Sequence, residues 1–222
     1  MPRRKTPLVT DHYYHVFNKG INGQNIFLDQ NDYQRMINSV WVYRYLFPPL
    51  RMSYLLRLTE KEIVKIKHSL AKEDRCVDII SYCFMSNHFH FLIKQLTDNG
   101  ISTFMGRLQD SYARYYNTKQ KRFGPLFQGR FKAVLIESEE QLIHVSRYIH
   151  LNPFSSFVVK DLPELRQYPW SSLQEYLTKT PYVCKTEILS ASFETPEKHW
   201  QFIADQADYQ RKLEQNKHLN LE

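Results

Sequence analysis

The bulk composition limits the kinds of protein this chain can be. Its 222 residues are 42% hydrophobic and 24% charged, which excludes general disorder and predicts one domain with embellishments. No apolar run reaches about 18 residues, and the basic start lacks the hydrophobic core of a secretory signal. The 3 cysteines have no CxxC spacing, so we expect reduced thiols in a cytoplasmic protein. The formal net charge of +7 and the 14% aromatic content favour a polyanionic partner such as nucleic acid.

The N-terminal third is predicted to hold a strand, a helix and a helical excursion. Residues 12–18, HYYHVFN, are typical of a strand that ends in a turn-rich segment. A helical pattern follows over 32–46, and the prolines of the FPP sequence end it. Thr59 and Glu62 have the spacing of a capping box, which opens a short helix. We interpret 48–75 as an excursion from the main fold.

The middle of the chain is predicted to form two strands and a long helix. Apolar runs at 77–85 and 89–95 flank the junction SNH and are typical of neighbouring strands. The turn sequence TDNG follows the second run. Apolar residues then recur at helical spacing until KQKRFGP breaks the pattern: Ile101, Phe104, Leu108, Tyr112 and Tyr115.

The last third starts with a further strand and helix. FKAVLIES at 131–138 is typical of a strand, and a capping box then opens a helix over 139–151. Asn152 and Pro153 should end that helix, because the residue before a proline avoids the helical conformation. Beyond it the chain is mixed and polar, with a helix expected in the region 196–215.

These elements predict an α+β fold. Their order is strand, helix, strand, strand, helix, strand, helix, with a short extra helix before the second strand. This order matches the ferredoxin-like split βαβ pattern, followed by an extra C-terminal helix and a tail. We expect an antiparallel sheet with helices on one face, which leaves the other face free to present functional groups.

Two histidines stand one residue apart in MSNHFHFLI, residues 85–93. Side chains alternate along a strand, so His88 and His90 share one face about 7 Å apart, while Phe89 and Phe91 face the core. Two imidazoles on one face are able to hold a metal ion. Half-buried histidines are common, however, so the pair needs a third partner before it indicates a metal site.

The helix predicted over 139–151 supplies a candidate partner. One of its stripes is apolar and should face the core: Leu142, Val145 and Ile149. Tyr148 and Asn152 lie one turn apart on an adjoining stripe. A phenol is able to act as a covalent nucleophile, and an amide oxygen is able to complete a metal site. The spacing fits equally well a tyrosine that packs on the helix flank with a hydrated hydroxyl, as most of the 15 tyrosines should.

A basic and aromatic segment, KQKRFGPLFQGRFK, follows the long helix. Its cations suit phosphate contacts and its phenylalanines suit base stacking. The alternative is a structural loop whose phenylalanines are buried, and both roles are compatible. The candidate DNA-binding residues, including two from the preceding helix, are Arg107, Arg114, Lys119, Lys121, Arg122, Arg130 and Lys132.

Three stretches together resemble a known family. SNHFHFLI, RFGPLFQGRFKAVLIES and RYIHLNP occur in family order and are similar to the single-tyrosine HUH transposases. Within that family they resemble the branch associated with repetitive extragenic palindromes (REP) in bacteria. The resemblance covers about residues 10–155. The 48–75 excursion and the 154–222 tail lie outside it.

The resemblance implies a role for each matched residue. It implies that His88 and His90 are the metal-binding pair, with Mg²⁺ or Mn²⁺ as the divalent cofactor. It implies that Tyr148 is the nucleophile, on a catalytic C-terminal helix, and that Asn152 helps to hold the metal or to position the tyrosine. His144 and His150 have no place in the pattern, so they receive no role.

The implied activity is metal-dependent cleavage and rejoining of single-stranded DNA through a 5′-phosphotyrosine. The expected partner is DNA with hairpin or palindromic ends, handled by a transposase or a domesticated transposase. We expect a transposase domain over 1–155 and a C-terminal extension over 156–222, in a monomer or homodimer without a membrane partner. The expected location is the bacterial cytoplasm, at the nucleoid when bound. Two alternatives remain open: a hairpin-specific DNA-binding protein without cleavage activity, and a two-histidine metal hydrolase that does not use Tyr148.

Overall fold

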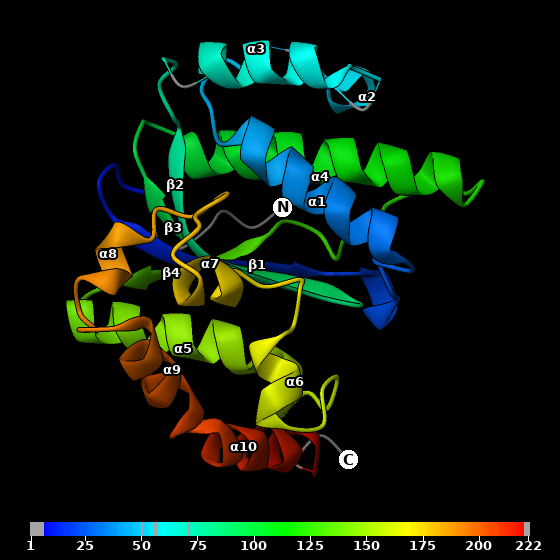
Figure 1. Cartoon of the computed structure of the whole chain (residues 1–222). Helices are drawn as coiled ribbons and strands as arrows, with labels where there is room; N and C mark the ends of the chain where they lie inside the picture. The colour runs from blue at the N-terminus through cyan, green and yellow to red at the C-terminus, as the bar shows by residue number, and fades with distance from the viewer. Residues whose placement is uncertain (1–6, 50, 56, 71, 220–222) are drawn as a thin grey trace.

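A four-stranded antiparallel sheet with the strand order β2-β3-β1-β4 lies at the centre of the computed structural model, which describes residues 7–49, 51–55, 57–70 and 72–219 (Figure 1). The strands are β1 (Tyr13–Lys19), β2 (Val77–Met85), β3 (His88–Gln95) and β4 (Lys132–Ile136). β2 and β3 form a hairpin, and β1 lies between β3 and β4. This strand order confirms the predicted ferredoxin-like split βαβ fold.

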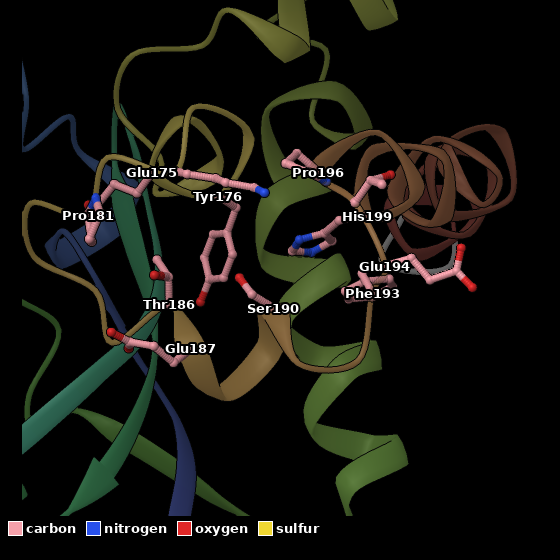
Figure 2. A pocket seen from close by; sticks show the side chains of 12 residues that line it. Glu175, Tyr176, Pro181, Thr186, Glu187, Ser190, Phe193, Glu194, Pro196 and His199 are labelled. Carbon is pink, nitrogen blue, oxygen red and sulfur yellow. The ribbon is translucent and has the colours of Figure 1, made fainter.

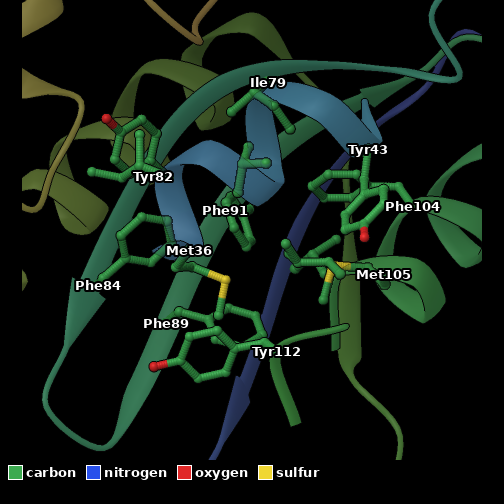
Figure 3. Packing of buried hydrophobic residues seen from close by; sticks show 14 of the residues in the cluster. Met36, Tyr43, Ile79, Tyr82, Phe84, Phe89, Phe91, Phe104, Met105 and Tyr112 are labelled. Atoms are coloured by element: carbon green, nitrogen blue, oxygen red, sulfur yellow. The ribbon is translucent and has the colours of Figure 1, made fainter. Parts of the chain in front are cut away.

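The first face of the sheet is covered by α1 (Gln30–Tyr43) and α4 (Gly100–Lys119) (Figure 1). The side chain of Asp29 caps α1 by accepting a hydrogen bond from the backbone of Asp32 at 3.1 Å. Large aromatic side chains from both layers fill the interface (Figure 3): Phe84, Phe89, Phe91, Phe104 and Tyr112. They make this the principal core of the protein.

The excursion holds two helices, α2 (Met52–Leu55) and α3 (Glu60–Leu70). The capping box is confirmed: the backbone of Thr59 donates to the Glu62 carboxylate at 2.8 Å, and the backbone of Glu62 donates to the Thr59 hydroxyl at 3.4 Å. Met52 and Leu55 pack against the principal core. The excursion is therefore tied to the principal core beside α1 and remains away from the second face of the sheet (Figure 1).

The second face of the sheet is also covered, which corrects the expectation of a free face. α5 (Glu139–Ser155) packs on it, where Ile80, Cys83 and Leu92 of the sheet meet Ile149 and Leu151. The reason lies in β2, whose nine residues are all buried. A strand that is apolar on both faces needs a layer on each side.

The helices that follow α5 complete that second layer: α6 (Leu162–Arg166), α7 (Leu173–Leu177), α8 (Glu187–Ser190), α9 (Pro196–Ala204) and α10 (Ala207–Leu219). The one other element is the 3-10 helix η1 (Ile21–Gly23), which follows β1 in the described part of the chain. The single helix expected over 196–215 is thus two helices. No helix in the described part of the chain is long and apolar enough to cross a membrane.

The end of α5 differs from its prediction. Pro153 lies inside the helix, which continues to Ser155 instead of ending at 152. A proline removes one backbone donor, yet the Asn152 carbonyl still accepts a hydrogen bond from Ser156 at 3.0 Å. Leu151 and Phe154 are buried on either side. Their packing holds the last turn in place and keeps Asn152 within the helix.

The C-terminal extension docks on α5 through α10, which runs alongside it (Figure 1). The Arg211 guanidinium donates to the Phe154 carbonyl at 2.9 Å and to the Val159 carbonyl at 3.0 Å. It also lies over the Phe154 ring, 3.2 Å from its centre. One arginine thereby joins α10 to the end of the helix that carries Tyr148 and Asn152.

Candidate active site

The histidine pair stands at the start of β3, directly after the hairpin turn. The ring centres of His88 and His90 are 5.1 Å apart and their planes are nearly perpendicular, at 89°. His90 is only 6% exposed, whereas His88 is half-buried. Phe89 and Phe91 point into the principal core on the opposite face. The predicted alternation therefore places both imidazoles on the face that α5 approaches.

Tyr148 and Asn152 of α5 meet this pair. The Tyr148 ring contacts the His90 ring edge-on, with ring centres 5.7 Å apart. The Asn152 amide nitrogen donates to the Tyr148 carbonyl at 2.9 Å, and the Asn152 side chain also hydrogen-bonds His88. The four residues singled out in the sequence thus come together in one chain, with the phenol beside the imidazoles.

Two further residues hold the imidazoles and were not foreseen. The Nδ1 atom of His90 lies 2.9 Å from Nε2 of His15, which comes from β1. The Nδ1 atom of His88 lies 2.6 Å from the side-chain oxygen of Asn87. In each ring of the pair Nδ1 is engaged, so Nε2 is the nitrogen left for a further contact, which at His88 is the one with Asn152. In the sequence, His15 lies between Tyr14 and Val16, which are both residues of the principal core. Alternation along the strand therefore places His15 on the other face of the sheet, with the histidine pair.

Burial keeps these imidazoles neutral at neutral pH. It lowers the pKa of His15 to about 4 and the pKa of His90 well below its ordinary value, and the neighbouring histidines lower that of His90 further. Burial also lowers the pKa of His88, although the hydrogen bond with Asn152 and the Glu214 carboxylate oppose the shift. Neutral imidazole is the form that binds metal ions, so the electrostatics suit ligation.

The donor set fits a divalent ion that keeps open positions. His88 and His90 offer two imidazole nitrogens, and Asn152 offers an amide oxygen. Within the described ranges, no group of three or more His, Cys, Asp and Glu side chains is placed to hold a metal. An ion at the pair would therefore take its remaining ligands from water or phosphate oxygens, as ions in phosphoryl chemistry do.

The C-terminal extension borders this site. The Gln210 side chain of α10 donates to the Tyr148 carbonyl at 3.1 Å, and the Glu214 carboxylate acts on the pKa of His88. The three sequence motifs do not include this region. The spacing of residues within α10 does not show which helix it packs against. Its contact with α5 is therefore seen only in the folded chain.

The candidate DNA-binding cations divide into two groups. Four donate hydrogen bonds within the protein: Arg107 to the Leu46 carbonyl at 3.0 Å, Lys119 to Asp32 at 2.6 Å, Arg122 to the Pro125 carbonyl at 2.9 Å and Arg114 to the Asp110 carbonyl at 3.2 Å. The other three, Lys121, Arg130 and Lys132, are exposed at the surface, and the Lys132 ammonium lies 6.0 Å from the centre of the Phe17 ring. The phenylalanines of this segment divide similarly, since Phe127 is buried in the core and Phe123 is 96% exposed.

A groove of about 960 Å³ runs between α4 and the segment 125–134. Arg130, Phe131 and Lys132 line it, together with Phe17 of β1. The Phe17 ring also contacts the His90 ring, with centres 5.6 Å apart. Phe17 therefore borders both the groove and the histidine pair.

A second cavity, of about 440 Å³, lies within the C-terminal extension (Figure 2). Tyr176, Ser190 and His199 point into it from α7, α8 and α9. His88, His90, Tyr148 and Asn152 are not among its lining residues. This cavity is separate from the candidate active site.

Known proteins share the sequence pattern and the fold of this chain. A family model described as "Transposase IS200 like" matches residues 31–152, a span that contains the histidine pair, Tyr148 and Asn152. No curated protein sequence matches the chain. Among solved structures, that of a REP-associated tyrosine transposase bound to a REP hairpin is similar, with a TM-score of 0.56 at 15% identity over 82% of this chain and 88% of that one. At that identity the likeness establishes the fold alone. The tRNA(His) guanylyltransferase from Saccharomyces cerevisiae has a TM-score of only 0.38, at 10% identity over 96% of this chain and 79% of that one.

Proposed function

This chain belongs to the IS200-like transposase family, and on that premise we propose that it cleaves and rejoins single-stranded DNA through a phosphotyrosine on Tyr148. The observation that carries the proposal is the contact of the Tyr148 ring with the His90 ring, 5.7 Å between centres, within one chain. A nucleophile beside a pair of metal-ligating side chains is the arrangement that phosphoryl transfer needs. The resemblance of the sequence to single-tyrosine transposases, which the family match confirms, supports the same assignment.

His88, His90 and Asn152 would hold the divalent ion, Mg²⁺ or Mn²⁺. When bound, such an ion polarises the scissile phosphate and offsets the negative charge that develops in the transition state. The hydrogen bonds at Nδ1 of both histidines orient the rings for this purpose. Asn152 has a second role, because its amide ties the ligand set to the backbone of Tyr148.

Tyr148 carries the covalent step. Its phenolic oxygen loses a proton and bonds to phosphorus, while the bond from phosphorus to the 3′ oxygen breaks. The departing 3′ oxygen takes up a proton and becomes a free hydroxyl, and the 5′ side stays attached to Tyr148. Because the ester preserves the free energy of the phosphodiester, attack by a 3′-hydroxyl reverses the reaction and joins strands without ATP.

DNA would bind in the groove between α4 and the segment 125–134 and pass Phe17 to reach Tyr148 on the second face of the sheet. Its walls combine the cations Arg130 and Lys132 with aromatic side chains, which suits phosphate contacts and base stacking. Phe17 links the groove to His90. Arg114 and Lys121 would extend the same surface. The similar solved transposase was bound to a hairpin, and we take hairpin or palindromic DNA as the substrate class here too.

We assign catalysis to the region 1–155 and treat 156–222 as an extension that packs on it. All four groups in the proposed chemistry lie in the first region, while Gln210 and Glu214 of the extension border them. Since one chain supplies the complete set, a monomer suffices for cleavage. With chromosomal DNA as substrate, the place of action is the bacterial cytoplasm at the nucleoid.

The decisive experiment is adduct formation with single-stranded hairpin DNA. With Mg²⁺ or Mn²⁺, the wild type should form a covalent complex that survives denaturing electrophoresis, and Tyr148→Phe should form none. Tyr209→Phe is the matched control, because Tyr209 is 61% exposed on α10 and should be dispensable. An adduct in Tyr148→Phe at the wild-type rate would reject the nucleophile assignment. Tight hairpin binding without any adduct in the wild type would favour a DNA-binding protein that does not cleave.

A further inference from the structure

His15 occupies a central position between the proposed ligand set and the proposed nucleophile. Its Nε2 lies 2.9 Å from Nδ1 of His90, and its ring contacts the Tyr148 ring edge-on with centres 5.9 Å apart. It lies on β1, outside residues 31–152 of the family match. We propose that His15 is a positioning residue, which accepts a hydrogen bond from His90 and so holds the Nε2 lone pair of His90 toward the metal.

The pairing of strands explains how His15 reaches His90. In the antiparallel ladder Phe17 lies directly opposite His90, and His15 lies opposite Leu92. His15 is thus the diagonal neighbour of His90 on the same face, a separation that ring side chains are able to span. The contact is set by the register of β1 against β3, because a shift of one residue would move His15 to the other face.

The hydrogen bond decides which nitrogen of His90 is free. One proton lies between the two ring nitrogens, on either His90 or His15. If it belongs to Nδ1 of His90, then Nε2 of that neutral ring has a lone pair for a cation. If His15 is the donor, a neutral His90 must carry its proton on Nε2 and is unable to ligate. Metal-binding histidines generally donate their second ring N–H in this way, which fixes both tautomer and orientation.

Solvent does not replace His15 in this role. The His90 side chain is only 6% exposed, and within the described residues His15 is the one hydrogen-bond partner of its ring. Asn87 performs the equivalent function for His88, whose Nδ1 it contacts at 2.6 Å. Both rings are therefore anchored at Nδ1 by different elements, the hairpin turn for His88 and the neighbouring strand β1 for His90.

Direct binding of Mn²⁺ to full-length protein tests this role without any turnover. His15→Leu removes the acceptor, so the Kd for Mn²⁺, followed by the electron paramagnetic resonance signal of the free ion, should rise roughly 10- to 100-fold. His15→Gln retains an amide oxygen able to accept from His90 and should keep most of the affinity. His12→Leu is the matched control, because His12 is exposed on the same part of the chain and its ring lies 3.0 Å from the Thr10 carbonyl, away from His90. The His12→Leu variant should bind Mn²⁺ with the same Kd as the wild type.

Nuclear magnetic resonance gives a second measurement that is independent of metal. Long-range ¹H–¹⁵N correlation spectra of the metal-free wild type should show His90 protonated at Nδ1, and His15→Leu should show a mixture of tautomers. Wild-type His90 protonated at Nε2 would overturn the inference. So would an unchanged Mn²⁺ affinity in a folded His15→Leu protein.

The inference rests on the proposed metal site, and the two fail in different ways. His88→Ala is the reference for the site and should abolish high-affinity Mn²⁺ binding. If wild-type binding is absent or is indifferent to His88→Ala, both the metal site and the role of His15 are rejected. If binding depends on His88 and is the same in His15→Leu, only the role of His15 is rejected.

Discussion

Basic side chains near the groove differ in what their charged groups contact, and this predicts different effects on DNA binding. Arg130 and Lys132 are exposed along the groove, so each should contribute about one phosphate contact. Replacing either by Ala should weaken hairpin binding and reduce the slope of log Kd against log salt concentration by about 1. Fluorescence anisotropy of labelled hairpin DNA over a range of salt concentrations measures both quantities.

Arg107 is the control for this prediction. It donates to the carbonyls of Tyr45 and Leu46 after the end of α1, so its charge already has partners in the protein. Arg107→Ala should leave the salt slope unchanged and should reduce the free energy of unfolding by about 1 kcal/mol. Unaltered slopes in both the Arg130 and Lys132 variants would show that DNA follows another path.

At the scale of elements, one side chain joins α10 to α5. Arg211 donates to the carbonyls of Phe154 and Val159 and lies over the Phe154 ring. Arg211→Ala should therefore lower the free energy of unfolding by about 1–2 kcal/mol, since charge-assisted hydrogen bonds and a cation–π contact are lost together. Hydrogen exchange should also become faster in α10. Lys212→Ala, one residue along and exposed, should change neither quantity; an equal effect of the two variants would contradict the role given to Arg211.

For the whole molecule, buried neutral histidines make stability depend on pH. Burial lowers the pKa of His199 from its ordinary 6.5 to about 4. Between those values the unfolded chain binds a proton that the folded chain does not, so stability falls as the pH drops from 6.5 toward 4. Between pH 7 and pH 5 we expect His199 to account for a loss of about 1–2 kcal/mol, measured by urea denaturation.

His199→Phe isolates that contribution. His199 stacks on Phe193 with ring centres 4.2 Å apart, and a phenyl ring retains the stacking while removing the titration. The variant should lose this part of the pH dependence, whereas His12→Phe, at an exposed position, should retain it. A wild-type pH profile in His199→Phe would mean that other groups govern acid sensitivity.

The sequence by itself determined the local features of this protein. Alternation along residues 88–91 assigned the two histidines and the two phenylalanines to opposite faces, and the structure agrees. Helical spacing put Tyr148 and Asn152 on one stripe, and capping residues located the starts of α3 and α5. These features depend on residues within a few positions of one another, so the local amino-acid sequence is enough to predict them.

Only the tertiary structure decided which elements meet. His15 and His90 are separated by 75 residues, and their contact depends on the register of β1 against β3. The covered second face, the docking of α10 beside Tyr148 and the ion pair that engages Lys119 are likewise contacts between distant segments. Such contacts follow from the pairing of strands and the burial of apolar faces across the whole chain, and no short stretch of sequence specifies its partner.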